Sequence, residues 1–318
     1  MLSQGQRYGI IGGGFGLYGY LVALGEMGHS EVVTFDRYRA RILERADLRG
    51  WDARIRYVSG LNDLAGECSR LIIAVNPRRQ AEIVGELVKA GWRGRLLLEK
   101  PVAPSPDEAN QTLIELERAS IEYGVGFSMM SCNWFSALRA LFARGWSEPA
   151  EIDMSWLFRA YHHSSDIETW KRRKSEGGGA LRYFAIHLVA VLASLADWTV
   201  TQASMDDSEP DAQRWCRFRL QSGNVRASCE CDTAATEASQ FRVVVRTEVA
   251  NQMVVNEPDP FVQSVDFNHT EIEDSRGRDR RVTMLKEMLI QFERDPKLNM
   301  GWYHRHIGLW KNIEDWSA

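Results

Sequence analysis

Two side chains that can handle protons lie four residues apart in an apolar segment of the chain. The segment 177–195, "GGGALRYFAIHLVAVLASL", opens with three glycines and carries Tyr183 and His187. In an α-helix this spacing places both side chains on one face. A histidine changes charge near neutral pH and suits general acid–base catalysis. Both residues would also be ordinary packing residues of a buried helix, so the spacing alone leaves catalysis and packing open.

A glycine-rich segment near the N-terminus predicts a dinucleotide site. In "GIIGGGFGLYGYL" (9–21) a short strand ends in glycines and opens a helix, which lets backbone N–H groups approach a pyrophosphate. One register uses Gly12, Gly14 and Leu17, with Gly16 relaxing the turn; another uses Gly14, Gly16 and Gly19 but begins two residues late. We prefer the first, because the tight turn must directly follow the strand. A glycine-rich surface loop is the alternative. The predicted cofactor-binding residues here are Gly12, Gly14, Phe15 and Gly16.

An acidic residue follows the next strand, in "VVTFDRYR" (32–39). The Asp36 carboxylate would accept hydrogen bonds from ribose hydroxyls and repel a 2′-phosphate, which favours NAD over NADP. The Arg37 guanidinium could stack on adenine or bind that phosphate, so NADP stays possible. The alternative role for Asp36 is an ordinary helix N-cap.

Two further segments follow later strands, "AVNP" (74–77) and "LLLEKPVAPSP" (96–106). Ligands of open parallel sheets lie at the carboxyl ends of the strands, so both segments should border the cofactor. A surface turn would also explain the adjacent charges of Glu99 and Lys100, but Pro101 fixes the backbone and directs Lys100 into the crevice. The residues predicted to line the cofactor here are Val75, Asn76, Pro77, Glu99 and Lys100.

The elements that position these residues change character near residue 150. Earlier, continuous apolar runs predict strands at 8–11, 31–35, 54–58, 70–75, 95–99 and 124–130, with helices between them. Such strands suit a parallel sheet covered on both faces. Later, alternating runs at 151–158, 214–223, 224–232 and 239–257 indicate an antiparallel sheet, and a helix at 281–295 is expected to close the chain.

The predicted fold class is therefore α/β in two domains. Residues 1–131 should form an NAD(P)-binding Rossmann domain with a doubly wound parallel sheet. Residues 132–318 should form an α+β domain for substrate binding and oligomerisation, with a large, open, mostly antiparallel sheet.

The motifs together resemble those of the Gfo/Idh/MocA oxidoreductases over nearly the full length. "EKP" (99–101) follows the Rossmann half, and "GGGALRYFAIH" is preceded by "TWKRRKSEGGG" (169–179). The resemblance implies hydride transfer between a nicotinamide and a carbinol or ketone carbon of a sugar, cyclitol or nucleotide sugar. The family's lysine, aspartate and histidine fall on Lys100, Tyr183 and His187. Tyr183 thus replaces an aspartate, and Ala185 stands where a glycine is usual.

The resemblance also implies roles for these residues. His187 would exchange the hydroxyl proton, Lys100 would hold the substrate oxygen, and Tyr183 would orient the substrate or donate a proton. Trp170 and Lys171 match the family's tryptophan–basic pair, so Trp170 is expected beside the cofactor. Because the aspartate is replaced, a catalytically inactive cofactor-binding regulator or scaffold is the alternative function.

Composition limits the classes of partner. The 318 residues are 44% hydrophobic and 26% charged, with a formal net charge of −4, which gives no basic surface suited to nucleic acid. No segment reaches the roughly 18 to 20 uninterrupted apolar residues that span a bilayer. The N-terminus reaches its first strand too soon to hold a signal peptide, so a cytoplasmic protein without nucleic-acid or membrane partners is expected.

Several residue types predict packing or assembly rather than metal chemistry. Five scattered cysteines without a CxxC pair indicate reduced thiols, and His162 and His163 are expected in a loop, with no metal site. Tryptophans of the C-terminal half suit a homo-oligomer, dimer or tetramer, formed through the open sheet. They are Trp156, Trp170, Trp198, Trp215 and Trp302.

Overall fold

The computed structural model describes residues 7–145, 149–209, 211–248, 250–261, 279, 281–294 and 300–317. They form two compact units. The first unit contains the described residues of 1–103, 111–128 and 271–300, and the second contains those of 104–110, 129–270 and 301–318. Both units are discontinuous in sequence. The assignment of residues 1–131 to cofactor binding and of residues 132–318 to substrate binding and oligomerisation remains a prediction.

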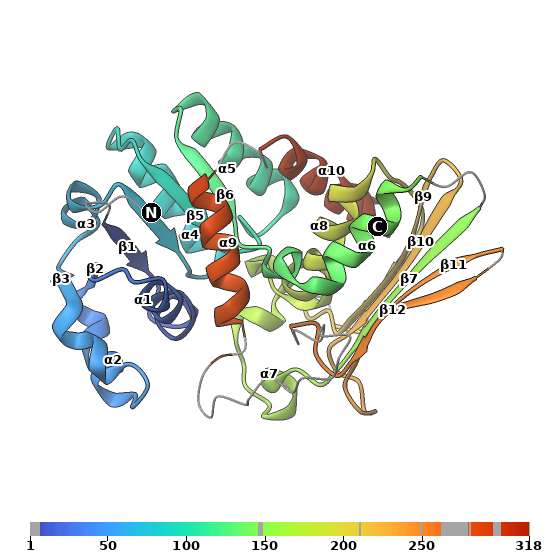
Figure 1. The fold of residues 1–318 in the computed structure, drawn as a ribbon, viewed down its shortest axis with the longest axis horizontal. Coiled ribbons are helices and arrows are strands. Elements are labelled where there is room, and N and C mark those ends of the chain that lie inside the picture. Colours follow the sequence, from blue (N-terminus) through green and yellow to red (C-terminus); the bar gives the residue numbers. More distant parts are fainter. Residues whose placement is uncertain are drawn as a thin grey trace. The chain divides into compact units, whose positions relative to one another are not determined.

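The first unit is built on a parallel sheet with the strand order β3-β2-β1-β4-β5-β6 (Figure 1). Most of the strand residues are buried, as expected for strands covered on both faces. The strand order reverses between β1 and β4, which is where ligands of doubly wound sheets bind. The strands are β1 (Tyr8–Ile11), β2 (Val32–Phe35), β3 (Ile55–Val58), β4 (Arg70–Ile73), β5 (Arg95–Leu98) and β6 (Glu122–Val125).

One predicted strand is displaced. The apolar run 124–130 is not a single strand, because β6 ends at Val125 and a 3-10 turn covers Ser128–Ser131. The backbone turns between them, where the Phe127 N–H donates to the Val125 carbonyl and the Ser128 N–H donates to the Gly126 carbonyl. Apolar composition alone does not show where such a turn begins.

Helices complete the first unit, and one of them comes from far along the chain. Val282, Leu285, Leu289 and Phe292 of α9 join the core formed by β1, η1 and α1. The first residues of helix α5, up to 110, belong to the second unit, and its remaining residues belong to the first. The helices are the π-helix η1 (Gly16–Leu21), α1 (Val22–Glu26), the 3-10 turns η2 (Asp36–Tyr38) and η3 (Arg49–Arg54), α2 (Arg39–Glu44), α3 (Leu61–Glu67), α4 (Pro77–Lys89), α5 (Pro106–Arg118) and α9 (Val282–Arg294).

The second unit contains a mixed sheet with the order β12-β11-β7-β10-β9-β8. Strands β7 and β10 pair in parallel and the other pairs are antiparallel, so the sheet is mostly antiparallel as predicted. The edge strand β8 was not predicted, because its short polar sequence alternates weakly. The strands are β7 (Ala150–Leu157), β8 (Thr199–Met205), β9 (Trp215–Ser222), β10 (Val225–Asp232), β11 (Gln240–Thr247) and β12 (Asn251–Glu257).

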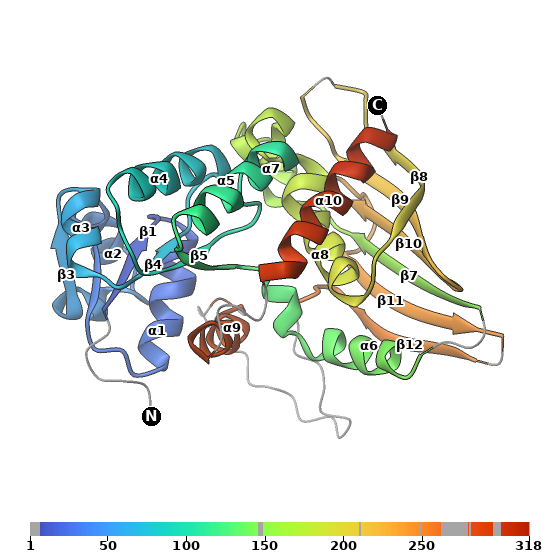
Figure 2. The same ribbon diagram turned by 90° about the horizontal axis from the view of Figure 1, so that it is seen from above.

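Helices α6, α8 and α10 lie on one face of this sheet, and among the described residues the other face carries no helix (Figures 1 and 2). The expectation that 281–295 closes the chain is wrong, because α10 follows it. The 3-10 turns η5 (Trp170–Arg172) and η6 (Lys174–Glu176) precede the glycines. The helices are η4 (Ser128–Ser131), α6 (Asn133–Ala143), α7 (Tyr161–Ser164), the π-helix η7 (Ala180–Ala185), α8 (Ile186–Leu195) and α10 (Met300–Trp316).

The run Lys174–Leu195 is the core helical segment of the second unit. By length and composition it could cross a membrane, but 78% of its most apolar window is buried inside the protein. All residues from Ile186 to Ala193 are buried. The apolar character of this segment is therefore accounted for by its place between the sheet and the other helices.

Candidate dinucleotide and substrate sites

The glycine loop after β1 has the shape that a dinucleotide requires. Gly12 has a φ of +150°, and a Cβ there would lie 2.2 Å from the Ala74 carbonyl oxygen at the end of β4. Gly14 is exposed, and a Cβ there would meet no atom within 4 Å. The loop therefore passes close to the sheet at one glycine and presents open backbone at the next, which fits a pyrophosphate.

The third position of the motif is filled by Gly16 rather than Leu17. A Cβ on Gly16 would lie 3.0 Å from Ile10 Cγ2 and 3.6 Å from Ala74 Cβ, so this glycine gives the close helix–strand contact. The role expected for Gly16, relaxing the turn, is corrected to packing. The π-helical first turn explains the irregular spacing, because it holds more residues than an α-helical turn.

Phe15 lies inside the loop and is fixed by aromatic and cationic neighbours. Its ring centroid lies 5.4 Å from that of Tyr20, and the Arg281 guanidinium carbon lies 4.1 Å above the ring. Arg281 directly precedes α9 and forms an ion pair with Asp279 at 2.7 Å. The segment around α9 thus supports the glycine loop, and no motif in the sequence predicts this contact.

Asp36 directly follows β2 and begins the 3-10 turn η2, and its side chain is exposed. Its Oδ1 accepts the Arg37 backbone N–H at 2.6 Å. The Arg37 guanidinium carbon lies 4.0 Å from the centroid of the Phe35 ring. Both side chains are therefore at the carboxyl end of the strand, where an adenosine ribose would be bound.

The EKP turn after β5 is held by a buried glutamine. The Gln80 amide nitrogen donates to the carbonyl oxygens of Glu99 at 2.6 Å, Val102 at 3.0 Å and Pro101 at 3.2 Å. Its Oε1 accepts the Glu99 N–H at 2.9 Å. Gln80 is fully buried, so these groups have no competing water. The backbone on both sides of Lys100 is therefore fixed by one side chain from α4.

The sequence analysis missed Gln80, although a signal existed. A glutamine on the apolar face of an amphipathic helix must be hydrogen-bonded when buried, and such a residue is a candidate for fixing backbone. The neighbouring predicted residues serve the same region. Asn76 caps α4, with its Oδ1 accepting the Arg79 N–H at 2.8 Å, and Pro77 is the first residue of the helix. Val75 is partly exposed between them.

Glu99 is directed to the glycine-loop helix. Its carboxylate accepts a hydrogen bond from the Tyr20 hydroxyl. Burial raises the pKa of Glu99, while the Lys100 ammonium and the Tyr20 hydrogen bond oppose that shift. Lys100 itself is half-buried. The two predicted motifs of the first unit, the glycine loop and the EKP turn, are thus joined through Tyr20 and Glu99.

Tyr183 and His187 lie in the second unit with different surroundings. Tyr183 belongs to the π-helical turn η7 and is partly exposed, whereas His187 is in α8 and only 2% exposed. The His187 ring centroid lies 5.8 Å from that of Phe261. The expectation of one shared α-helical face is therefore too simple, because a π-helical turn alters the angular spacing of the residues.

Aromatic and cationic groups surround Tyr183. Trp170 makes an edge contact with its ring at 5.1 Å, and Lys171 Nζ lies 5.3 Å from the ring centroid. Arg172 and Arg173, by contrast, pair with Asp166 at 3.2 Å and Glu168 at 2.8 Å. The predicted tryptophan–basic pair, Trp170 and Lys171, thus contacts the ring of Tyr183.

The prediction that His162 and His163 are loop residues is wrong, because both belong to the single helical turn α7. His162 stacks on Phe184 with centroids 5.9 Å apart. Burial, followed by His163 and Lys171, lowers the pKa of His162 to about 4. It is therefore a neutral packing residue at neutral pH.

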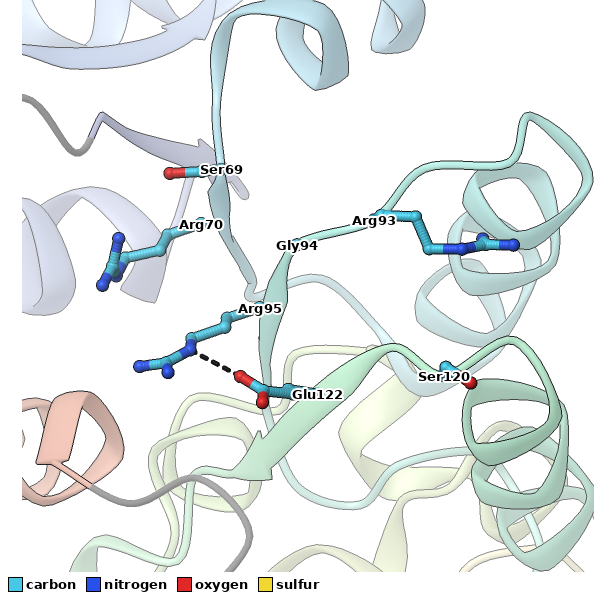
Figure 3. A pocket seen from close by; sticks show the side chains of 7 residues that line it. All are labelled: Ser69, Arg70, Arg93, Gly94, Arg95, Ser120 and Glu122. Atoms are coloured by element: carbon cyan, nitrogen blue, oxygen red, sulfur yellow. Dashed lines mark hydrogen bonds and ion pairs between the residues drawn. The ribbon is translucent and has the colours of Figure 1, made fainter.

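A cavity of 340 Å³ lies at the opposite end of the first sheet, where β4, β5 and β6 begin. Figure 3 shows that Arg95 turns to Glu122 at 2.6 Å while Arg93 extends the other way, and Arg95 also donates to the Glu293 carbonyl oxygen at 3.1 Å. Arg70 pairs with Glu293 of α9. The cavity therefore lacks a common focus for a ligand. Its lining residues are Ser69, Arg70, Arg93, Gly94, Arg95, Ser120 and Glu122.

Solved structures share this fold over nearly the whole chain. GenD2 from gentamicin A biosynthesis, solved with NAD, has a TM-score of 0.74 and 14% identity, covering 99% of this chain and 95% of its own. WlbA dehydrogenase from Bordetella pertussis, solved with NADH and UDP-GlcNAcA, has a TM-score of 0.74 and 14% identity, covering 99% and 97%. The 3-ketoreductase KijD10 from Actinomadura kijaniata, solved with NADP and TDP-benzene, has a TM-score of 0.68 and 13% sequence identity, and the match covers 98% of each chain.

The family is indicated by the N-terminal part of the sequence. No curated protein matches this chain by sequence. Residues 6–127 match the model of the oxidoreductase family with the NAD-binding Rossmann fold, GFO_IDH_MocA, which confirms the resemblance seen in the motifs. Over these residues the chain is similar to the Gfo/Idh/MocA oxidoreductases.

Proposed function

We propose that the protein is an NAD(P)-dependent oxidoreductase. It transfers a hydride between the nicotinamide and a carbinol or ketone carbon of a sugar, cyclitol or nucleotide sugar. The observation that carries this proposal is the buried Gln80 clamp on the EKP turn, because it fixes the backbone at the one lysine that the family uses. A turn that served only as a surface connection would not need three buried hydrogen bonds from one side chain.

The residues of the first unit fit a dinucleotide. The backbone from Gly12 to Gly16 would hold the pyrophosphate, and Asp36 and Arg37 would hold the adenosine ribose. Val75, Asn76, Pro77 and Glu99 would line the remaining length, and Trp170 of the second unit would contact the cofactor. When bound, the nicotinamide supplies the hydride acceptor or donor.

Side chains of the protein take up and return the hydroxyl proton of the substrate. His187 is proposed as the general acid–base that takes the hydroxyl proton in oxidation and returns it in reduction. Lys100 is proposed to donate a hydrogen bond to the reacting oxygen. Tyr183 orients the substrate through its hydroxyl in place of the family's aspartate, and Lys171 supplies a positive charge beside its ring.

A nucleotide sugar is the substrate class that the relatives favour. WlbA was solved with a UDP-sugar and KijD10 with a TDP compound. Both have the same fold as this chain over nearly its whole length. At 13 to 14% identity they support the class of compound and not the reacting hydroxyl. We therefore propose a nucleotide sugar ahead of a free sugar or cyclitol.

Assembly through the open face of the second sheet is proposed, with a cytoplasmic location. Met253 on that face is 51% exposed and lies opposite Val244 of the neighbouring strand. Charged pairs lie along the same face, Arg246 of β11 with Asp153 of β7 and, further along the sheet, Arg217 of β9 with Glu230 of β10. Two of the tryptophans expected at this interface, Trp156 and Trp198, are only 6% and 9% exposed and are not available to a second copy.

Two substitutions test the proposed chemistry. His187→Ala and Lys100→Met should each lower kcat by about 100-fold or more while the Kd for NADH changes little. Trp92→Phe serves as a control in the first unit, at the opposite end of the sheet. A wild-type protein that binds the cofactor and shows no turnover would instead support the inactive regulator.

A further inference from the structure

Arg182 is a buried arginine directly before Tyr183, and no role was predicted for it. It lies in the π-helical turn η7 and is only 9% exposed. An arginine is rarely buried unless its charge is paired, because removing that charge from water costs free energy. The groups that hold Arg182 therefore indicate what this side chain does.

Four hydrogen bonds from Arg182 reach three separate segments of the second unit. Its Nε and Nη2 donate to the two carboxylate oxygens of Glu314 at 2.7 and 2.6 Å. Its Nη1 donates to the carbonyl oxygens of Pro104 at 2.7 Å and Lys174 at 2.9 Å. Arg182 therefore connects α10, the turn η6 and the chain that follows the EKP turn.

Glu314 is itself held in place within α10. The Trp310 indole Nε1 donates to Glu314 Oε1 at 2.8 Å, and Trp310 is 1% exposed. The side chains of Arg182 and Glu314 are each 11% exposed. Well-packed apolar residues in place of such a buried ion pair are often at least as stabilising. Stability alone therefore does not account for this pair.

The segments that Arg182 holds adjoin residues of the proposed site. Tyr183 is the next residue on the turn, so fixing Arg182 also fixes the direction in which Tyr183 leaves the helix. Pro104 lies four residues after Lys100 in the chain, and Lys174 precedes the glycines that open η7. One guanidinium thus restrains the backbone on which two proposed site residues depend.

We propose that Arg182, held by Glu314, is a positioning residue for the reaction. It fixes the turn from which the Tyr183 hydroxyl orients the substrate, and it fixes the backbone by which the chain leaves the EKP turn. The inference rests on the proposed function, because it concerns the same site. A displacement of about 1 Å at a reacting group costs about 100-fold in rate, so restraint of this backbone affects the reaction directly.

Kinetics and hydrogen–deuterium exchange of the full-length protein test this role. With NAD and a panel of UDP- and TDP-sugars, Arg182→Met should lower kcat by about 100-fold. Its Kd for NADH should stay within about three-fold of the wild type, because the glycine loop is not touched. Exchange needs no substrate, and the amides of 102–105 and 174–184 should exchange about 10-fold faster in Arg182→Met.

The double variant Arg182→Met/Glu314→Gln separates positioning from stability. It removes both charges, so no buried carboxylate is left without its cation, and its Tm should recover toward that of the wild type. The carbonyl groups of Pro104 and Lys174 still lack their donor. Its kcat should therefore stay as low as that of Arg182→Met. If Arg182→Met does not fold, the double variant alone is compared with the wild type.

Arg70→Met is the matched control. Arg70 is 5% exposed and donates to both carboxylate oxygens of Glu293 where β4 begins, at the opposite end of the first sheet from the glycine loop. Its loss should lower Tm as the loss of Arg182 does, because each leaves a buried carboxylate without its cation. The kcat of Arg70→Met should stay within about three-fold of the wild type.

The outcomes distinguish this role from the proposed function. Equal loss of kcat in Arg70→Met and Arg182→Met, or recovery of kcat together with Tm in the double variant, would show that Arg182 acts through stability alone. A wild-type kcat in Arg182→Met, or unchanged exchange in both segments, would also overturn the proposal. A wild-type protein without turnover would instead overturn the proposed function.

Discussion

At the scale of single residues, the position of Lys100 depends on Gln80. Replacing Gln80 with leucine leaves the carbonyls of Glu99 and Val102 without their buried donor. Since small displacements of a reacting group cost about 100-fold in rate, we expect Gln80→Leu to lower kcat by about that factor. The Kd for NADH should be nearly unchanged, because the glycine loop is not touched. Steady-state kinetics and cofactor titration measure the two effects.

Trp92→Phe separates this positioning role from a loss of stability. The Trp92 indole donates to two buried carbonyls, of Ala65 at 3.1 Å and Cys68 at 3.2 Å, at the start of the sheet and away from the EKP turn. Both variants should lose about 1 to 3 kcal/mol of unfolding free energy. If both also lost kcat equally, or if Gln80→Leu kept its kcat, the positioning role would be wrong.

His162 gives a residue-scale prediction for pH. Its pKa is about 4 in the folded protein against 6.5 for the free side chain. The unfolded chain therefore binds the proton first, so stability is complete above pH 6.5 and falls as the pH decreases toward 4. His162→Phe keeps the stacking on Phe184 and should reduce the slope of unfolding free energy by up to about 1.4 kcal/mol per pH unit.

Tyr161→Phe, on the same helical turn, controls for packing at α7. Tyr161 is 74% exposed, so its replacement should leave the surroundings of His162 unchanged, and urea denaturation at several pH values should give the wild-type slope. A slope in His162→Phe that equals that of the wild type would mean that His162 takes up its proton in the folded protein as readily as in the unfolded chain.

At the scale of elements, the two glycines of the cradle have separable functions. Gly12→Ala places a Cβ against the Ala74 carbonyl at a φ of +150° and should cost about 2 to 3 kcal/mol of stability. Gly14→Ala meets open space and should cost less than about 1 kcal/mol. Both should weaken NADH binding, since both alter the backbone at the pyrophosphate. Thermal unfolding and cofactor titration distinguish them, and equal destabilisation by both would contradict the cradle geometry.

The same elements show what the sequence could reveal. Strand β1 was predicted with its observed bounds, because four apolar residues end directly at a glycine. The role of Gly16 was not, because it depends on the π-helical turn, which residue spacing does not reveal. Tyr183 and His187 were found by spacing, yet their different burial follows from a second π-helical turn. Gln80 acts through tertiary contacts, and only its polar side chain on the apolar face of a helix marks it in the sequence.

At the scale of the whole molecule, two patterns of apolar residues, continuous and alternating, predict the two sheets and the direction of their strands. Continuous runs predicted the parallel sheet and alternating runs a mostly antiparallel one, as the structure confirms, while the parallel pair of β7 and β10 was not predicted. The return of α9 to the first unit was not predictable, because it requires Glu293 to meet Arg70 and Phe292 to enter a distant core. Amphipathic helices identify their buried face but not the sheet that they cover.

The proposed oligomer gives a prediction at this scale. Met253→Asp places a charge on the uncovered face of the second sheet and should convert the oligomer to monomer, measured by sedimentation velocity. Tyr161→Phe, at an exposed site outside the sheet, should leave the oligomer intact. A wild-type monomer, or an oligomer unaffected by Met253→Asp, would contradict assembly through this face.

The most direct test of the central claim is the absorbance of reduced nicotinamide when the wild-type protein is mixed with NAD or NADP and nucleotide sugars, free sugars or cyclitols. We expect cofactor reduction with at least one of these classes, and we expect His187→Ala to abolish it while that variant still binds NADH. Saturable NADH binding by the wild type with no change in absorbance for any class, in either direction of the reaction, would contradict it.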